Sequence, residues 1–465
     1  MSRRMRRRDF LRLSALATAG TALAACAPEV VKETVIVEKP VDKVVKETVI
    51  VEGTPQVVEK VVTAVPSQQE PITLVYPNKW HSRAEAKYEA TDWIISTFEA
   101  KYPYIKIDSI PNPNKPEMLK KIQADCVAGD CPDLFERARQ EEWNSGWLLD
   151  LVPYIDDVWM SRLEPESVKM NSWEGHIFGI GTEISPVPCW WNLKVLEQVD
   201  AEPPTNWEEI LTLAEALKQE GLFFASFAFG LDNHLPWNLL RRQPGADEAQ
   251  VNEQWDSEYV RFTVERLKEL SDGGYHPPND LDMSWRQAVP LWQNHRMALL
   301  MNGAWGIAQM IDAEGLDPEL KEKVVFTPMP KTGPEGNSTG MVCAGQIGIG
   351  KHLENDPNKL DAALKFVDHF TSVDAALKWA DSGRSLMGVR IPPEKWQTIL
   401  ERRPLLAAFM TAWDSSDVQW SVSLPSLTIR TAAWVQFVPI RDSLLSGGSV
   451  DDAVAAYAAE MEKFG

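Results

Sequence analysis

Tryptophan is unusually common among the side chains that could contact a ligand, with 19 tryptophans against eight tyrosines. An indole offers a large flat apolar face and one polar N–H group, which suits stacking against a ring. The seven histidines are scattered along the chain, and none pairs with another at the spacing of metal ligands on a helix. These residue types favour a stacking ligand, and they predict neither a metal site nor a cofactor.

One glycine-rich segment could be mistaken for a nucleotide site. Residues 345–351 fit the phosphate-binding pattern G-x-x-x-x-G-K, but His352 stands where that pattern needs Ser or Thr to hold Mg²⁺. We interpret the segment as a strand, 346–349, that ends in a glycine turn. The zinc-protease pattern H-E-x-x-H does not occur. We therefore predict that the protein is not an enzyme.

Length and charge limit the classes of protein to consider. A chain of 465 residues, 44% hydrophobic and 25% charged, is too long for one core and suits two globular lobes. Its net charge of −20 gives the wrong field for a phosphate backbone. Nucleic acid is therefore not an expected partner.

The first 26 residues predict export and a lipid anchor. Arg-Arg-Asp-Phe-Leu-Arg at 7–12 resembles the twin-arginine signal, and Leu-Ala-Ala-Cys at 23–26 resembles the bacterial lipobox, in which the cysteine is lipidated. The alternative, a membrane-spanning helix, needs about 20 apolar residues, more than this stretch contains. We therefore expect an extracytoplasmic lipoprotein anchored to the membrane through Cys26.

Cysteine spacing predicts one disulfide. Cys126 and Cys131 flank Val-Ala-Gly-Asp, a turn that can bring two Cα atoms within disulfide range, and export places them in an oxidising compartment. The alternative is two free thiols. Cys189 and Cys343 are interpreted as small buried apolar residues.

Residues 27–70 differ in composition from the rest of the chain. Val-Val-Lys-Glu-Thr-Val-Ile-Val-Glu occurs at 30–38 and again at 44–52, with prolines nearby and no aromatic residue. The two copies could pair with each other, but we favour a flexible tether that lifts a domain off the membrane, with a reach of roughly 35–40 Å.

From Pro71 onward the pattern alternates between strand and helix. Apolar runs at 72–76 and 105–110 predict strands, and the apolar periodicity of 85–101 predicts a helix between them. A capping box at 205–208 opens a further amphipathic helix. This alternation predicts an α/β fold. Further amphipathic helices are expected at about 116–129, 256–270, 360–370, 428–445 and 450–463.

Several short motifs then follow one another in a known order. They are Gly-Asp-Cys-Pro-Asp-Leu-Phe at 129–135, Phe-Gly-Ile-Gly-Thr-Glu at 178–183, Cys-Trp-Trp-Asn at 189–192, Pro-Pro-Thr-Asn-Trp at 203–207, Trp-Gln-Asn-His-Arg at 292–296 and Leu-Leu-Ser-Gly-Gly at 444–448. Together they resemble the family 1 extracellular solute-binding proteins, the maltose-binding-protein-like receptors of ABC importers, over residues 71–463.

This resemblance implies a two-lobed periplasmic-binding-protein fold with three interlobe crossovers. We expect the crossovers near 184–188, 326–331 and 371–375. The N-terminal lobe would comprise 71–184 plus 331–372, and the C-terminal lobe 185–330 plus 373–465. The resemblance further implies a monomer whose lobes close around a solute and then dock on the permease subunits of an ABC transporter.

The resemblance also implies where a sugar would bind. Trp305 matches the position at which sugar-binding relatives stack a pyranose ring, and Trp434 resembles a second stacking position. Ring hydroxyls require planar polar partners such as carboxylate and guanidinium groups. Core packing is the alternative role for each tryptophan. The expected ligand-binding residues are Trp80, His81, Glu136, Arg137, Glu183, Trp191, Trp237, Trp305, Arg384 and Trp434.

The leading hypothesis for function is a receptor that binds a carbohydrate, expected to be an oligosaccharide, and delivers it to an ABC permease. The sequence Trp190-Trp191-Asn192 departs from the family's aliphatic-Tyr-Asn pattern, so the identity of the sugar does not carry over. Two alternatives stay open, a secreted glycoside hydrolase and a sensory or adhesive protein of the same fold.

Overall fold

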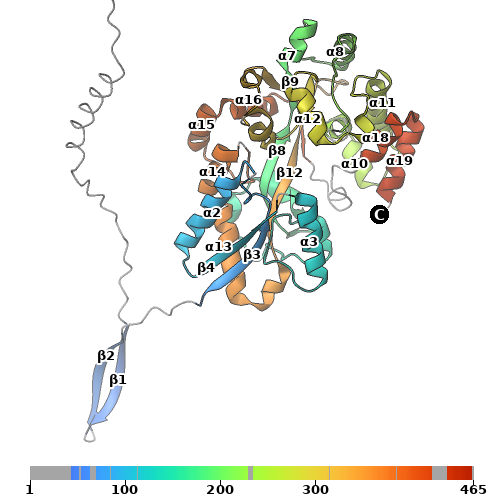
Figure 1. Ribbon diagram of the computed structural model, residues 1–465. Coiled ribbons are helices and arrows are strands. Elements are labelled where there is room, and N and C mark those ends of the chain that lie inside the picture. Colours follow the sequence, from blue (N-terminus) through green and yellow to red (C-terminus); the bar gives the residue numbers. More distant parts are fainter. Residues whose placement is uncertain are drawn as a thin grey trace, which may run out of the picture. The chain divides into compact units, whose positions relative to one another are not determined.

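The structure, a computed structural model, describes residues 43–51, 54–62, 70–83, 85–112, 114–228, 234–313, 315–383, 385–421 and 437–462 (Figure 1). The chain divides into two units, 1–69 and 70–465, which we describe separately. The expected export signal and lipidation site at Cys26 lie outside the described residues. None of the described helices is long and apolar enough to cross a membrane.

The first unit contains a β-hairpin within residues 27–70, the segment for which we predicted a tether. Strand β1 (Lys43–Val51) pairs antiparallel with β2 (Thr54–Val62), and Val51 lies opposite Thr54. Valine and other β-branched residues are frequent in these two segments and favour extended backbone. The second copy of the repeat therefore pairs with 54–62, not with the first copy.

The second unit begins with the expected strand–helix–strand. Strands β3 (Ile72–Asn78) and β4 (Ile105–Pro111) are parallel, with α2 (Tyr88–Lys101) between them in the chain. From much later in the sequence, α13 (Pro357–Phe370) packs against β3. Leu74, Phe98 and Phe366 join in a first hydrophobic core.

Helix α3 (Lys115–Val127) and strand β5 (Leu134–Phe135) share a smaller core. The structure contains a disulfide between Cys126 and Cys131, whose Cα atoms are 4.1 Å apart. Cys189 is a buried free thiol, whereas Cys343 is partly exposed. The short elements that follow are α4 (Gln140–Asn144), α5 (Asp157–Ser161), α6 (Pro165–Met170), β6 (Ser172–Trp173) and β7 (His176–Ile177).

Two long strands connect the two lobes of this unit. Strands β8 (Ile180–Val187) and β12 (Ser338–Ile349) lie side by side and antiparallel through its middle (Figure 1). Ile180 and Ile347 belong to the first core, whereas Val187 belongs to a second core. Strand β8 thus passes from the first core to the second, and β12 passes back beside it.

Helix α14 (Val373–Gly383) contacts two of the hydrophobic cores. It contributes Ala375, Ala376 and Trp379 to the first core. Val389, which follows the helix, also belongs to that core. Ala380, on the same helix, contacts a third core that includes Phe409 of α16 (Pro404–Asp414). Helix α14 therefore lies at the junction of the lobes, not wholly in the C-terminal one.

The second lobe is built on both faces of a small sheet. Strand β9 (Cys189–Asn192) lies between β10 (Leu299–Met301) and β11 (Val324–Thr327). Because neighbouring side chains of a strand point to opposite faces, Trp190 enters the third core and Trp191 the second. The remaining helices of this lobe are α7 (Leu193–Leu196), α8 (Trp207–Gln219), α9 (His234–Arg241), α10 (Ala246–Val251), α11 (Glu258–Asp272), α12 (Trp285–Gln293), α15 (Pro393–Arg402), α18 (Val438–Leu445) and α19 (Val450–Glu462). Strand β13 (Val418–Ser421) pairs in parallel with the start of β12.

The predicted capping box is one residue out of place. Asn206, not Thr205, caps α8, because its Oδ1 accepts from the backbone N–H of Glu209 at 3.0 Å. The Glu209 carboxylate in turn accepts from the backbone N–H of Thr205 at 2.7 Å. The start of α8 is therefore held by the two contacts of a capping box, a side-chain cap and a returning carboxylate, but the cap is Asn206 and the carboxylate is that of Glu209.

Candidate functional site

A pocket of about 540 Å³ lies between helices that belong to different cores. On one side lie residues at the start of α2 and residues of α14, and both helices pack in the first core. The opposite walls come from the π-helical segment Ile307–Ile311 and the start of α16, which pack in the third core. The residues that line it are Arg83, Glu85, Ala86, Tyr88, Glu89, Ala308, Asp312, Lys378, Asp381, Ser382 and Arg403.

Polar contacts hold several of these lining residues in place. Arg403 Nε lies 3.1 Å from Asp381 Oδ1. Gln309 Nε2 donates to Glu85 Oε2 at 3.4 Å, which links opposite walls of the pocket. Since the lining offers guanidinium, ammonium, carboxylate and aromatic groups together, it can contact both the hydroxyls and the apolar faces of a polar ligand.

A buried cluster next to the pocket brings together three of the predicted site residues. Trp80, Glu136 and Glu183 are 3%, 0% and 1% exposed. Glu183 accepts from the ammonium of Lys87, which lies 3.8 Å from the centre of the Trp80 ring. Glu136 accepts from the backbone N–H of Lys79, whose own ammonium lies 4.3 Å from the same ring. Trp80 is thus a cation–π partner of two lysines and offers little free face for stacking.

Burial shifts the ionisation of the cationic groups in this cluster. It lowers the pKa of Lys87 well below its ordinary value, and Lys79 acts in the same direction, while Glu85 and Glu136 oppose the shift. It also lowers the pKa of Arg137, which Glu136 opposes. Arg137 is 9% exposed, and its Nε has no hydrogen-bond partner among the described residues. Its guanidinium therefore retains a donor that a ligand could use.

His81 lies beside the pocket but is held by the protein. Its Nδ1 lies 2.9 Å from Ser109 Oγ, and its ring stacks on Tyr88 with centroids 5.3 Å apart. Because Tyr88 lines the pocket, His81 supports the wall and orients that aromatic ring.

Trp305 lies one helical turn before Ala308, which lines the pocket. Its indole is half-buried and packs against the second core. The ring folds over Gly303, where an added Cβ would come within 2.3 Å of ring atoms. A glycine is thus needed beneath the indole, whose exposed part could contact a ligand.

Trp191 and Trp237 are core residues. Trp191 is 0% exposed, and its Nε1 donates to Thr327 Oγ1 at 2.8 Å. Trp237 is 1% exposed and meets Phe437 edge to face, with ring centroids 5.2 Å apart. Because protein atoms cover both rings, the expected contact with a ligand does not fit their placement. Arg384 and Trp434 lie outside the described residues.

Sequence reasoning missed the lysines of the buried cluster. Lys87 immediately precedes α2, where a lysine ordinarily points to solvent, and Trp379 on α14 comes from a distant part of the chain. Their rings and charges meet only through packing, with Lys87 Nζ 5.5 Å from the centre of the Trp379 ring. The sequence carries no local signal for this contact.

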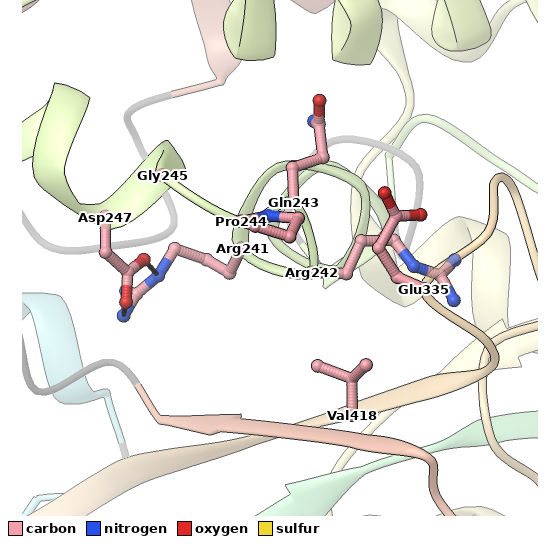
Figure 2. A pocket seen from close by; sticks show the side chains of 8 residues that line it. All are labelled: Arg241, Arg242, Gln243, Pro244, Gly245, Asp247, Glu335 and Val418. Atoms are coloured by element: carbon pink, nitrogen blue, oxygen red, sulfur yellow. Dashed lines mark hydrogen bonds and ion pairs between the residues drawn. The ribbon is translucent and has the colours of Figure 1, made fainter.

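A second hollow, of about 460 Å³, lies within the second lobe (Figure 2). Arg241 and Arg242 line it, but both are held by the protein. Arg241 pairs with Asp247. Arg242 donates to the carbonyl of Pro330 at 2.8 Å and to the hydroxyl of Thr332 at 3.0 Å. Arg241 and Arg242 therefore make structural contacts within the protein.

Residues 336–340, Gly-Asn-Ser-Thr-Gly, fit the hydrolase pattern G-x-S-x-G, which our reading of the sequence overlooked. Ser338 is 0% exposed at the start of β12, and its hydroxyl donates to Asn238 Oδ1 at 3.3 Å. A nucleophile elbow needs an exposed serine on a turn from strand to helix, so this match does not fit. Within the described part of the chain, no group of three His, Cys, Asp or Glu side chains could hold a metal ion.

The fold and the pocket together define a class of protein. Two α/β lobes, joined by long strands and with a polar pocket between them, form a two-lobed binding protein. The chain belongs to the family of bacterial extracellular solute-binding proteins, whose model matches residues 79–377.

Curated relatives agree with this family at low identity. A multiple sugar-binding protein of Streptococcus mutans is 21% identical over 349 residues, which cover 70% of this chain and 77% of the relative. An uncharacterized ABC transporter extracellular-binding protein of Pyrococcus horikoshii is 22% identical over 265 residues, or 52% of this chain and 58% of that protein.

Solved structures share the fold. A chitin oligosaccharide binding protein superposes with a TM-score of 0.71 at 19% identity, covering 85% of this chain and 99% of its own. An ABC substrate-binding protein from Listeria monocytogenes in complex with cycloalternan superposes with a TM-score of 0.67 at 20% identity, covering 85% and 99%.

Proposed function

We propose that this protein is an extracytoplasmic receptor that binds a carbohydrate, in particular an oligosaccharide, between its lobes and delivers it to an ABC permease. The observation that carries the proposal is the polar pocket with an aromatic wall in a chain of the solute-binding family. The name of the Streptococcus mutans relative, a multiple sugar-binding protein, and the cycloalternan bound by the Listeria protein support a carbohydrate as the solute.

The residues around the pocket have the chemistry that a sugar requires. Arg83 and Glu85 offer a donor and an acceptor to ring hydroxyls, and Arg137 and Glu183 add a second pair from the buried cluster. In this proposal, Trp305 supplies the apolar face on which a ring stacks.

The anchor and the partner belong to the same proposal. Lipidation of Cys26 would hold the receptor at the membrane, and residues 27–70 would act as its tether, in which the hairpin 43–62 shortens the reach of a fully flexible coil. Residues 70–465 would then work as a monomer that presents closed lobes to permease subunits.

Calorimetry tests the receptor proposal. The mature protein is titrated with chitobiose, xylotriose, raffinose and maltotriose, and at least one should release or absorb heat with a 1:1 stoichiometry. Each mixture is then analysed by chromatography, because a receptor leaves the sugar intact and a hydrolase does not. Absence of heat with every sugar contradicts the carbohydrate assignment, and appearance of shorter sugars favours the hydrolase.

A further inference from the structure

Lys87 is a lysine enclosed by protein where a surface residue would be expected. It immediately precedes α2, and its side chain is only 3% exposed. Its ammonium contacts the Glu183 carboxylate and lies above the ring of Trp80, with Trp379 at the side. Burying a lysine is costly unless a carboxylate or an aromatic face compensates the charge, and here both do.

Glu183 is bound through one of its two oxygens. Its Oε1 accepts from Lys87 Nζ and also from Ser385 Oγ, the latter at 3.0 Å. The described residues place no hydrogen-bond partner on the second oxygen, Oε2. A carboxylate oxygen can accept two hydrogen bonds, so Oε2 keeps its capacity to accept. Glu183 itself lies on β8, the strand that crosses between the lobes.

A glycine makes room for the lysine. Gly383 is the last residue of α14, and a Cβ added to it would lie 2.8 Å from Lys87 Cγ and 3.4 Å from Lys87 Cε. The approach to Cγ is too close for an ordinary contact, so an alanine at this position would push the lysine stem aside. The path of Lys87 from α2 to β8 thus depends on a residue of a third element.

Among the described residues, the charges around this pair balance. Besides Glu183, the described charged groups that act on Lys87 are Lys79, Arg137, Glu85 and Glu136. With Lys87 itself these are three cations and three carboxylates. A ligand that reaches Glu183 therefore need not bring a charge of its own, which suits the hydroxyl of a neutral sugar better than an ammonium group.

We propose that Lys87 is a positioning residue for ligand binding: it fixes Oε1 of Glu183, together with Ser385, so that Oε2 is held ready to accept a hydrogen bond from a hydroxyl of a neutral sugar. The proposal rests on the carbohydrate-receptor function proposed above. Lys87 itself does not contact the sugar. It acts through Glu183.

The test compares two lysines that lie over the same ring. Lys87→Met keeps the apolar stem and removes the charge, and Lys79→Met does the same at the lysine that does not bond Glu183. The probe is whichever of chitobiose, xylotriose, raffinose and maltotriose binds the wild type most tightly. We expect Lys87→Met to weaken binding about tenfold to a hundredfold. Lys79→Met removes an ion pair with Glu85 at 3.6 Å and should weaken binding less.

The pH profile separates positioning from general loss of structure. Without its ammonium partner, the buried Glu183 carboxyl binds a proton more readily. The affinity of Lys87→Met should therefore fall more steeply than that of the wild type from about pH 8 to about pH 5. Combining Lys87→Met with Glu183→Gln should remove this pH dependence and weaken binding no further than Glu183→Gln alone. Equal losses for the two lysine variants, or a flat profile for Lys87→Met, overturn the proposal.

Failure of the receptor function gives a different result. If the wild type binds none of the four sugars, the carbohydrate assignment is wrong, and with it the role of Lys87 toward a sugar. The pairing of Lys87 with Glu183 is then still measured by a double-mutant cycle in urea unfolding, in which the two substitutions should be strongly non-additive. Additive losses show that the pair is not coupled.

Discussion

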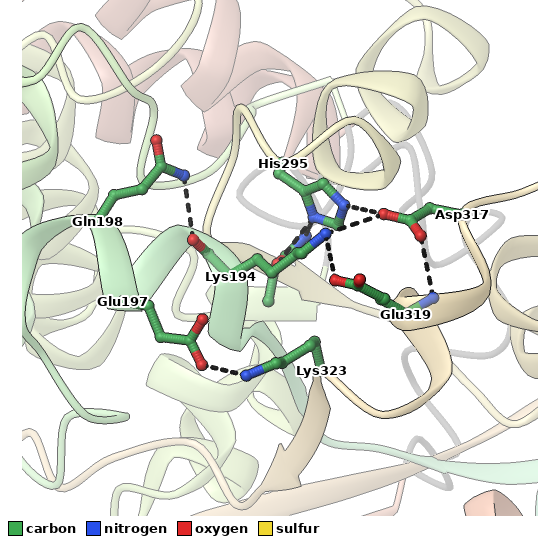
Figure 3. A network of polar contacts seen from close by, with 8 residues as sticks. Lys194, Glu197, Gln198, His295, Asp317, Glu319 and Lys323 are labelled. Atoms are coloured by element: carbon green, nitrogen blue, oxygen red, sulfur yellow. Dashed lines mark hydrogen bonds and ion pairs between the residues drawn. The ribbon is translucent and has the colours of Figure 1, made fainter.

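His295 Nε2 lies 2.9 Å from Asp317 Oδ2 in the second lobe, and the same carboxylate oxygen lies 3.1 Å from Lys194 Nζ (Figure 3). The network joins three separated segments: the start of α7, the turn after α12 and the loop before β11. Hydrogen bonds from His295, from the backbone N–H of Glu319 and from Lys194 lower the pKa of Asp317 to about 2. Because these contacts favour the ionised form of Asp317, the stability of the folded protein should depend on pH in the acidic range.

We expect the contribution of Asp317 to be lost in acid. Because its folded pKa is lowered, the stabilisation is fully present above the unfolded pKa of about 3.9 and disappears as the pH falls through about 2. Asp317→Asn should thus be less stable than the wild type at about pH 6, and the difference should shrink at about pH 2.5. Urea unfolding followed by circular dichroism measures it. Asp108→Asn, an exposed carboxylate on β4, is the control, and a gap that stays constant with pH contradicts the linkage.

Replacing Trp305 with alanine should weaken sugar binding without unfolding the protein. Stacking of one ring face is worth about 1–3 kcal/mol by area, or roughly tenfold to a hundredfold in affinity. Trp285→Ala is a suitable control, because that indole is 44% exposed on α12 and does not line the pocket. Calorimetry gives the affinities, and circular dichroism checks the fold. An unfolded Trp305→Ala protein would show that the indole is needed for packing.

Lipidation at Cys26 predicts where the protein partitions. The wild type should enter the detergent phase of a phase-separation assay, and Cys26→Ala should move it to the aqueous phase, because an acyl chain contributes about 0.8 kcal/mol for each buried methylene. Cys343→Ala serves as the matched control, since that thiol lies in the folded unit. Identical partitioning of the wild type and Cys26→Ala would rule out the lipobox assignment.

The disulfide should be detectable in the exported protein. Without reductant, mass spectrometry should find the peptides that contain Cys126 and Cys131 joined. Replacing both with serine should lower the free energy of unfolding by about 2 kcal/mol, since the bridge closes a short loop. Two freely alkylated cysteines in the wild type would contradict the pairing.

Local patterns in the sequence predicted much of the fold. The run 72–76 became β3, and the apolar periodicity of 85–101 became α2, which starts at Tyr88. The cysteine pair flanks a turn only a few residues long, so chain geometry alone brought it within range. These features depend on neighbours in the chain, and side-chain spacing records them directly.

The tertiary structure decided which side chains reach the site. Local residue patterns do not predict that Trp191 is covered on both faces whereas Trp305 is half-buried. The difference arises because β9 is the central strand of its sheet, whereas Trp305 sits where the chain leaves β10. Lys87 is buried for a similar reason, since Trp379 and Gly383 reach it from a helix almost three hundred residues away. The burial of these side chains depends on how distant elements pack against one another, so local sequence patterns do not predict it.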